Sequence, residues 1–571
     1  MKRHYLAASI LLVLGTSLPI DSAHAATLYV KQGSSGSGTS WNDAFGNPND
    51  ALAAAIAGDE IWVASGTYIP GSQRTDSFYL KNEVEIYGGF AGAETSRDQR
   101  DPEVNETILS GELGDPSSVV DNTNNIVWVL SNVEAHLDGF TITRGNARAG
   151  EKHGGGILVQ GGSIKARNLK IIDNRADIEG GGVELEIASG SLFEDCLFTQ
   201  NFSQSVGGGL TITGDSSDIS IVDCDFIDNE AVKRGGGVSG FGPRNVYFVG
   251  CLFQGNRAEE GGGLYFSYTN GQTSPKNVEF INTRIIENEA TQEGGGVFFD
   301  FYWDEVLMKN CVVARNTSSM WSGVALIAPE ANSGAVIENC SIFDNSNEGL
   351  PNAENHGIYA TSAASFPLSV VVRNSIVWGN GNETLNAQVQ ADLDGATVYP
   401  EYSNIQNLSD TVGFGNLSAN PLFIDDEGHL HPSSPCIDRG TNFSGGITNL
   451  VDLDGNRRRY DSPGAPNLGE GDPPNIDLGP YEKGSPTYPG RIYVDKNAAG
   501  NNDGSGPLDA YTALIDAFTE IDQLGNQALL FRPLEVWVAA GTYAPSGPDP
   551  VMAGLENSDM RASSFELVNN V

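Results

Sequence analysis

The feature of this sequence that most constrains its fold is a run of three glycines that occurs six times. A glycine-rich phosphate loop occurs once per site, whereas self-similarity at a period of about 20 to 50 residues is typical of a solenoid of stacked repeats. The glycines therefore predict a corner that recurs in every repeat. The runs begin at Gly154, Gly180, Gly207, Gly235, Gly261 and Gly294, at intervals of 26, 27, 28, 26 and 33 residues.

Each repeat also carries an asparagine, and short segments with an apolar residue at every second position flank the glycines. Asparagine tolerates the left-handed conformation of a tight turn, and apolar alternation indicates strands. No apolar residue recurs with helical spacing through the repeats, which excludes a helical solenoid. The sequence predicts an all-β fold, a right-handed parallel β-helix whose coils rise by about 4.8 Å. The asparagines are Asn174, Asn201, Asn229, Asn256, Asn288, Asn316, Asn345 and Asn380.

Five of the six cysteines share one position of the repeat, five residues before an asparagine. In an exported chain cysteines often form disulfides, but these five would stack as one column that points into the coil. We expect buried, free thiols that behave as small apolar side chains; bridges between neighbours are the alternative. Neither arrangement makes them catalytic, because inward thiols lack access. The five are Cys196, Cys224, Cys251, Cys311 and Cys340.

The repeat resembles that of a known family. "GGGV" or "GGGL" is paired with "CLFTQN", "CDFIDN" and "CLFQGN", which resembles the repeat of chlamydial polymorphic outer membrane proteins. This resemblance implies a pectin-lyase-like fold. The opening "DEIWVASGTYIP" and the closing "NPLFIDDEG", "SSPCIDRG", "DLDGNRRR" and "IDLGPYE" are similar to secreted bacterial β-helix proteins, and the closing set to an anchor-associated (choice-of-anchor Q-like) C-terminal domain. These motifs cover most of residues 27–483 and imply a fold, not an activity.

The two ends of the chain are distinctive. The first 25 residues have a basic start, an apolar run and a final "AHA", as in a secretory signal peptide. "NPNDALAAAIAG" predicts a short capping helix, with Asn47 as N-cap, Pro48 at the first position and Gly58 as the stop. "EVWVAAGTYAP" near the end repeats "EIWVASGTYIP". We therefore expect a signal peptide (1–25), a capping module (26–70), the β-helix (71–419), the anchor-associated region (420–483), a linker (484–490) and the start of a second, truncated copy (491–571).

The chain has a formal net charge of −41. Such an acidic surface repels nucleic acid and anionic lipid, so neither is expected as a partner. Alternatively, the acidic residues only occupy solvent-facing positions and turns and have no role in binding. No apolar run outside the first 25 residues reaches the length of about 18 residues that a membrane helix needs, so no transmembrane helix is expected.

A catalytic constellation is not apparent in the repeats. In polysaccharide lyases of the resembled fold, an acid cluster holds Ca²⁺ and a basic residue removes a proton. After each glycine run the odd positions point in and the even ones out, so Glu184 and Glu186 share a face, but no basic residue follows on the next coil. His153 is interpreted as a surface loop residue. The sequence therefore predicts no catalytic residue.

Two weaker sites remain as candidates. Tyr265, Phe298 and Tyr302 point outward by the alternation, with Asp300 beside them and Trp321 at the next corner. Exposed aromatic faces can bind sugar rings, so this patch is the candidate carbohydrate site, unless a longer loop covers it.

The second candidate is a metal site. Asp452 and Asp454 lie in a "DLDG" stretch that is similar to half of a calcium loop but lacks its further ligands. We take them as candidate Ca²⁺ ligands.

Taken with the resemblance, these features suggest an exported or cell-surface protein with a binding, adhesion or display role, with polysaccharide or cell-surface components as partners. A polysaccharide lyase or glycoside hydrolase is the first alternative. An inert surface spacer is the second.

Overall fold

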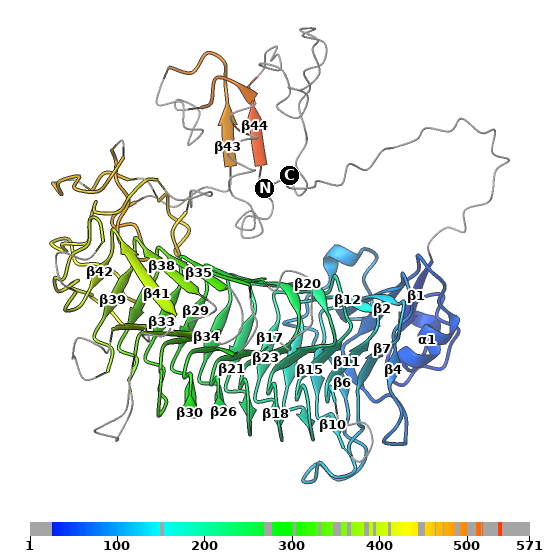
Figure 1. Cartoon of the computed structure of the whole chain (residues 1–571). Coiled ribbons are helices and arrows are strands. Elements are labelled where there is room, and N and C mark those ends of the chain that lie inside the picture. The colour runs from blue at the N-terminus through cyan, green and yellow to red at the C-terminus, as the bar shows by residue number, and fades with distance from the viewer. Residues whose placement is uncertain are drawn as a thin grey trace, which may run out of the picture.

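A computed structural model describes residues 26–485 with short gaps, the longest being 268–276, 347–355 and 444–450, together with 491–499 and parts of 510–517 and 535–539. The expected signal peptide lies outside these residues. The strands of successive coils pair in parallel and stack along one long axis from α1 (Pro48–Ala54) to β42 (Asn404–Ile405) (Figure 1). The prediction of an all-β parallel β-helix is confirmed.

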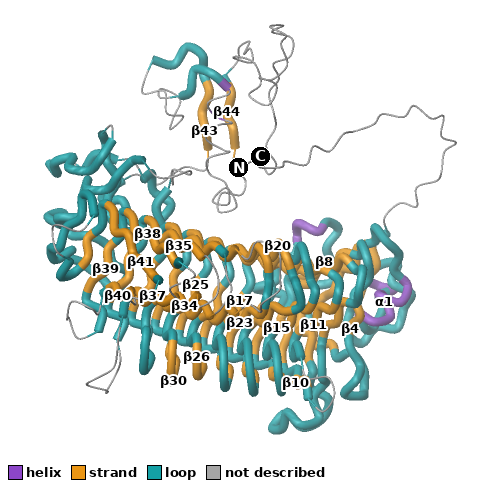
Figure 2. Tube along the Cα trace, in the orientation of Figure 1, coloured by secondary structure: helices purple, strands orange, loops and turns teal. Residues whose placement is uncertain are grey.

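Three long sheets form the walls of the coil, and the tube trace shows their strands in rows (Figure 2). Sheet A has 13 strands and sheet B has 12. Sheet A comprises β1 (Thr27–Val30), β2 (Glu60–Ala64), β5 (Glu85–Phe90), β8 (Glu134–Asp138), β12 (Ser163–Arg167), β16 (Leu192–Glu194), β20 (Ser217–Val222), β24 (Arg244–Val249), β28 (Asn277–Ile281), β32 (Glu305–Lys309), β35 (Ser333–Glu338), β38 (Leu368–Arg373) and β41 (Ala396–Glu401). Sheet B comprises β3 (Gly66–Tyr68), β6 (Thr107–Ser110), β9 (Thr141–Thr143), β13 (Lys170–Ile172), β17 (Leu197–Thr199), β21 (Asp225–Ile227), β25 (Leu252–Gln254), β29 (Arg284–Ile286), β33 (Val312–Ala314), β36 (Ser341–Phe343), β39 (Ile376–Trp378) and β42.

The third wall, sheet C, follows the glycine corners and has 11 strands, and a short sheet D of six strands precedes those corners. Sheet C comprises β4 (Phe78–Tyr79), β7 (Val127–Val129), β11 (Ile157–Gln160), β15 (Val183–Glu186), β19 (Leu210–Thr213), β23 (Val238–Phe241), β27 (Leu264–Ser267), β31 (Val297–Asp300), β34 (Val324–Ala328), β37 (Ile358–Ser362) and β40 (Val389–Ala391). Sheet D comprises β10 (Asn146–Ala147), β14 (Arg175–Ala176), β18 (Phe202–Ser203), β22 (Glu230–Ala231), β26 (Arg257–Glu260) and β30 (Glu289–Glu293).

The interior consists of columns of like residues. Each asparagine of the repeat is buried and bonds to the next: the Asn256 carboxamide donates to Asn288 Oδ1 at 2.9 Å and to the Phe226 carbonyl at 2.8 Å, and it accepts from the Asn229 backbone. The rings of Phe226 and Phe253 stack at 4.8 Å. All six cysteines are buried and free, and for the five of the repeat this is the expected interior thiol column.

The glycine runs form one column at the corner between sheets D and C, as the spacing predicts. The first glycine of each run has a φ between 63° and 67°, a left-handed conformation that L side chains rarely adopt. A Cβ on Gly261 would lie 2.8 Å from the Tyr265 Cβ and 2.6 Å from the Leu264 carbonyl oxygen. The corner therefore folds back closely over the strand that follows it.

The N-terminal end of the coil is covered by α1. Asn47 caps this helix by accepting from the Asn49 amide, and Pro48 occupies its first position, as predicted. The helix ends at Ala54, before the predicted stop at Gly58, and buries Ala51 and Leu52 in the main core. Two 3₁₀ turns complete this end of the coil, η1 (Trp41–Asp43) and η2 (Arg97–Gln99).

The described residues of the closing region, between 420 and 483, pack on the outer surface of the later coils. Leu453 and Tyr481 join a cluster with Val312 and Phe343 of sheet B. The Asn310 carboxamide donates to the Val451 carbonyl at 2.7 Å. The closing region is thus part of the folded solenoid. Across the described residues, no helix is both long and apolar enough to cross a bilayer.

The last described strands repeat the opening of the chain. β43 (Arg491–Val494) pairs in parallel with β44 (Glu535–Val538), so that Arg491 lies opposite Glu535, as Thr27 lies opposite Glu60 at the start. The matching register agrees with the internal sequence repeat.

Candidate functional site

The outer face of sheet C carries side chains of several chemical kinds. The register aligns one outward position on successive strands, which we call the first outward column: Tyr79, Trp128, Leu158, Glu184, Thr211, Ser239, Tyr265, Phe298, Ala325 and Tyr359. Aromatic, acidic and hydroxyl side chains follow one another here, and no residue type recurs from coil to coil as it does in the interior columns. Because stacking does not impose these identities, this face is where function can reside.

Burial divides the first outward column into two parts. From Leu158 to Tyr359 its members are at most 5% exposed, and the glycine corners fold over those from Leu158 to Phe298. The expectation that Tyr265 and Phe298 form an open aromatic surface is therefore wrong: they point out of the coil but are 0% and 2% exposed. The Arg234 guanidinium covers the Tyr265 ring at 4.9 Å.

The rest of the predicted aromatic patch is dispersed. Tyr302 lies outside the described residues. Trp321 is half-buried and stacks on Tyr359 at 4.4 Å. Asp300 accepts a hydrogen bond from the Tyr265 hydroxyl at 2.9 Å. Carbohydrate binding by these residues stays a prediction, but stacking on Tyr265 and Phe298 would require the corner to move.

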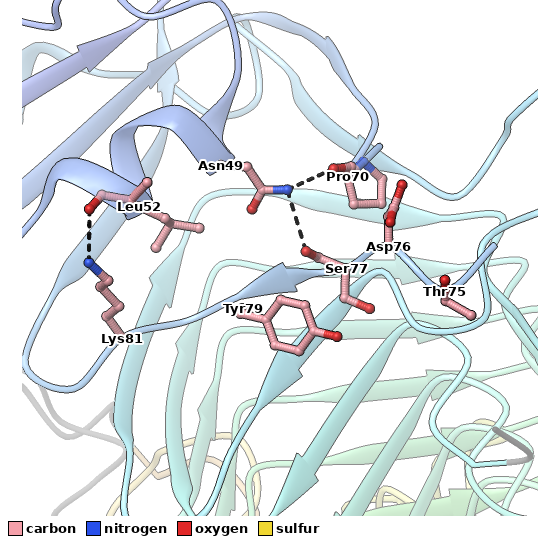
Figure 3. A pocket seen from close by; sticks show the side chains of 9 residues that line it. Asn49, Leu52, Pro70, Thr75, Asp76, Ser77, Tyr79 and Lys81 are labelled. Atoms are coloured by element: carbon pink, nitrogen blue, oxygen red, sulfur yellow. Dashed lines mark hydrogen bonds between the residues drawn. The ribbon is translucent and has the colours of Figure 1, made fainter. Parts of the chain in front are cut away.

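The N-terminal end of the same column, ahead of the first glycine run, is more open. Tyr79 is 42% exposed, and its ring stacks on Trp128 at 5.6 Å. Beside it lies a hollow of about 420 Å³ between α1 and β4. Figure 3 shows the Tyr79 ring between Lys81 and Thr75, with Asn49 on the helix above. We call this place the N-terminal hollow; it is lined by Asn49, Leu52, Ala53, Pro70, Thr75, Asp76, Ser77, Tyr79 and Lys81.

The framework of the N-terminal hollow is tied by hydrogen bonds. The Lys81 ammonium donates to the Ala55 carbonyl at 2.9 Å, at the C-terminal end of α1. The Asn49 carboxamide donates to the Pro70 carbonyl at 2.7 Å. These contacts fix the walls, while the Tyr79 face and the Thr75 hydroxyl remain turned to solvent. Sequence alternation alone could have identified Tyr79, but it did not distinguish covered from open positions.

A row of ionisable groups lies further along the face. The Arg234 Nε donates to Glu260 at 2.7 Å, and both side chains are partly exposed. Burial raises the pKa of Asp300 to about 6, opposed by the Tyr265 hydroxyl and the Arg234 charge. Burial also raises the pKa of Glu293, and the charges of Glu260 and Asp300 add to that shift. Asp300 therefore holds its proton up to a higher pH, about 6, than an exposed aspartate does.

Between these places lies a cluster that sequence reasoning missed. His153 and Glu179 each precede a glycine run, and their backbones pair across neighbouring coils. The His153 Nδ1 lies 3.0 Å from Glu179 Oε2. Glu184 of β15 joins them, so that one ligand atom from each of the three lies within 4.8 Å of the others. The 26-residue interval between the first two runs was the signal that could have paired His153 with Glu179.

The predicted calcium ligands are not brought together on one centre. The Asp452 carboxylate accepts from the backbone amides of Asp454, Asn456 and Glu482 and from the Asn456 carboxamide. The Asp454 carboxylate instead contacts His429 Nε2 at 2.9 Å. Metal binding by Asp452 and Asp454 stays a prediction, and these hydrogen bonds argue against it because they use the Asp452 lone pairs to hold the turn.

A buried acidic cluster lies nearby in the closing region. Asp438, Asp477 and Glu482 have ligand atoms within 4.8 Å of one another, and burial raises the pKa of Asp477 to about 7. The buried Arg458 supplies a positive charge, 3.9 Å from Glu482, and donates to the Gly479 carbonyl. This cluster therefore ties the closing motifs together from inside.

Comparison with known proteins supports the architecture. A family model described as a right handed beta helix region matches residues 116–280, which agrees with the expected hand of the coil. None of the curated proteins compared matches the chain. The solved pectate lyase Pel9A is 16% identical, with 81% of this chain and 97% of that chain covered and a TM-score of 0.42. A rhamnogalacturonan lyase is 14% identical, with coverages of 70% and 91% and a TM-score of 0.33. These low scores carry no conclusion about activity.

Proposed function

We propose that the chain is an exported or surface-displayed protein that binds a neutral polysaccharide along the outer face of sheet C, beginning at the N-terminal hollow. The observation that carries this proposal is the open Tyr79 ring, stacked on Trp128 beside a hollow with hydroxyl, amide, carboxylate and ammonium groups. An aromatic face with polar groups at its edge suits a sugar ring, which has apolar faces and a hydroxylated rim.

The charge of the chain narrows the class of ligand. With a net charge of −41, the surface repels polyanions at low salt. Neutral sugars avoid this repulsion, and their hydroxyls can donate to Asp76 and to the carboxylates further along the face. An extended polymer also matches the shape of the site, because neighbouring strands repeat at about 4.8 Å along the coil axis.

The test is binding to a glycan array and to soluble neutral and acidic polysaccharides. Tyr79→Ala should weaken binding to a neutral polymer at least tenfold. Tyr399→Ala is the matched control, because Tyr399 is 49% exposed but lies on sheet A. Equal losses in both variants, preference for acidic polymers, or no glycan binding by the parent chain would contradict the proposal.

A cleaving enzyme is the second candidate, favoured by one observation. Asp300 has a raised pKa and shares a site with Arg234 and Glu293, so a proton donor and charged groups lie on the same face. Incubation with neutral and uronate polysaccharides, followed for new reducing ends and unsaturated products, tests it. Turnover by the parent chain that Asp300→Asn abolishes would favour the enzyme over a binding protein.

The resemblance of residues 420–483 to anchor-associated domains adds a proposal about location. Export by residues 1–25 and attachment through the closing region would place the polysaccharide-binding face at a cell surface. Cell fractionation after expression of the full chain, compared with a chain lacking residues 1–25, tests export directly.

A further inference from the structure

We propose that His153, Glu179 and Glu184 bind one divalent transition-metal cation, for which Zn²⁺ is the best fit. The site lies at the corner between sheets D and C, and it does not depend on polysaccharide binding. His153 and Glu179 contribute from the residues before two successive glycine runs, and Glu184 contributes from β15. One ligand atom from each residue lies within 4.8 Å of the other two.

The first argument is the state of the Glu184 carboxylate. This side chain is 1% exposed, and its Oε1 accepts from the Thr213 hydroxyl at 2.7 Å. Its Oε2 is buried and has no hydrogen-bond partner among the residues that the structure describes. A buried carboxylate oxygen without a donor is costly, so the site calls for a cation or a bound proton.

The electrostatic surroundings favour a cation. The buried Glu184 carboxylate lies close to the negative charges of Glu179 and Glu186. The Thr213 hydroxyl donates to this carboxylate, and no Lys or Arg is among the described groups that act on it. The buried acidic cluster of the closing region differs, because Arg458 already supplies its positive charge.

The next coil shows that the fold does not need these three residues. Val206 and Thr211 occupy the positions that correspond to Glu179 and Glu184. There the Thr211 hydroxyl accepts from the Gly180 amide at 2.8 Å and donates to the Val206 carbonyl at 3.2 Å, which satisfies the corner locally. The acidic and imidazole groups one coil earlier therefore add something that the corner itself does not require.

The donor set selects the metal. One imidazole nitrogen and two carboxylates suit Zn²⁺ better than Ca²⁺ or Mg²⁺, which prefer oxygen ligands throughout. The side chains of His153 and Glu179 are 41% and 26% exposed, whereas Glu184 is buried. The cation would thus be bound by the buried Glu184 on one side and would face solvent on the other, which leaves a coordination position for water or another ligand.

Calorimetric titration of the full, tag-free chain with Zn²⁺, and separately with Ca²⁺, is the experiment. We expect one Zn²⁺ per chain, with affinity reduced at least tenfold in Glu184→Gln and in His153→Asn. His136→Asn is the matched control, since His136 lies 3.9 Å from Glu85 and 3.8 Å from Glu134 but, among the described residues, forms no three-residue cluster of ligand atoms. It should bind as the parent does.

Thermal unfolding supplies a second readout that separates lost ligation from lost folding. Zn²⁺ should raise the unfolding temperature of the parent and of His136→Asn, but not that of Glu184→Gln. Without metal, Glu184→Gln should be at least as stable as the parent, because an amide avoids burial of a charge. Absence of saturable Zn²⁺ binding, unchanged affinity in both site variants, or tighter binding of Ca²⁺ than of Zn²⁺ would overturn the proposal.

Discussion

Tyr79 and Tyr265 occupy the same outward column of sheet C, yet 42% of one is exposed and none of the other. Strand alternation is the same at both places, so it cannot explain the difference. Gly261 and the corner around it fold over Tyr265, whereas no glycine run precedes Tyr79. The direction in which a side chain leaves the coil and its access to solvent are therefore set by different parts of the repeat.

The largest expected effect tests whether an outward residue can belong to the core. Phe298→Ala should lower the free energy of unfolding by about 3 kcal/mol, because a buried aromatic ring leaves a cavity. Tyr79→Ala should lower it by less than about 1 kcal/mol, since its ring is largely open. Denaturant unfolding followed by circular dichroism gives both values. If Phe298→Ala is as stable as Tyr79→Ala, the corner does not seal the column.

The second prediction concerns the corner itself. Gly261→Ala should cost about 2 kcal/mol, because it combines a positive φ of 64° with a Cβ 2.6 Å from the Leu264 carbonyl oxygen. Gly334→Ala is the control: an added Cβ meets no atom closer than 4.0 Å, so its stability should change by less than about 1 kcal/mol, towards greater stability. The same unfolding assay compares them, and equal destabilisation would mean that the corner is not a strained glycine site.

The interior could be predicted from the sequence because each column constrains its own members. The Asn256 side chain accepts a hydrogen bond from the Asn229 backbone amide and donates one to Asn288 Oδ1. Asparagine recurs at this position because its carboxamide can do both. Cys224 and Phe226 recur for a related reason, since interior residues of neighbouring coils pack directly on one another. The N-cap at Asn47 was likewise visible, because capping depends on a few adjacent residues.

The candidate sites could be predicted only in part, because they depend on contacts between coils. The pairing of His153 with Glu179 needs the register at the corner, which the 26-residue interval encodes but a motif search does not reveal. The burial of Tyr265 depends on Arg234, a residue of the preceding corner. Leu453 and Tyr481 pack on residues of sheet B that lie more than a hundred positions earlier in the chain. Such a contact produces no periodic pattern in the sequence, so it could not be predicted.

The smallest expected effect is a dependence of stability on pH that comes from Asp300, beside the covered Tyr265. Burial raises the pKa of Asp300 from 3.8 to about 6. Between these pH values the folded chain retains the Asp300 proton, whereas the unfolded chain has released it. The stability that this proton contributes is therefore complete at low pH and is lost as the pH rises through about 6. Asp300→Asn carries no charge at any pH and can still accept from the Tyr265 hydroxyl. The parent should therefore lose stability relative to Asp300→Asn between pH 4 and pH 7, by about 1 kcal/mol once partial exposure is allowed for. Unfolding midpoints at the two pH values measure the difference, and parallel pH profiles would show that the corner does not desolvate Asp300.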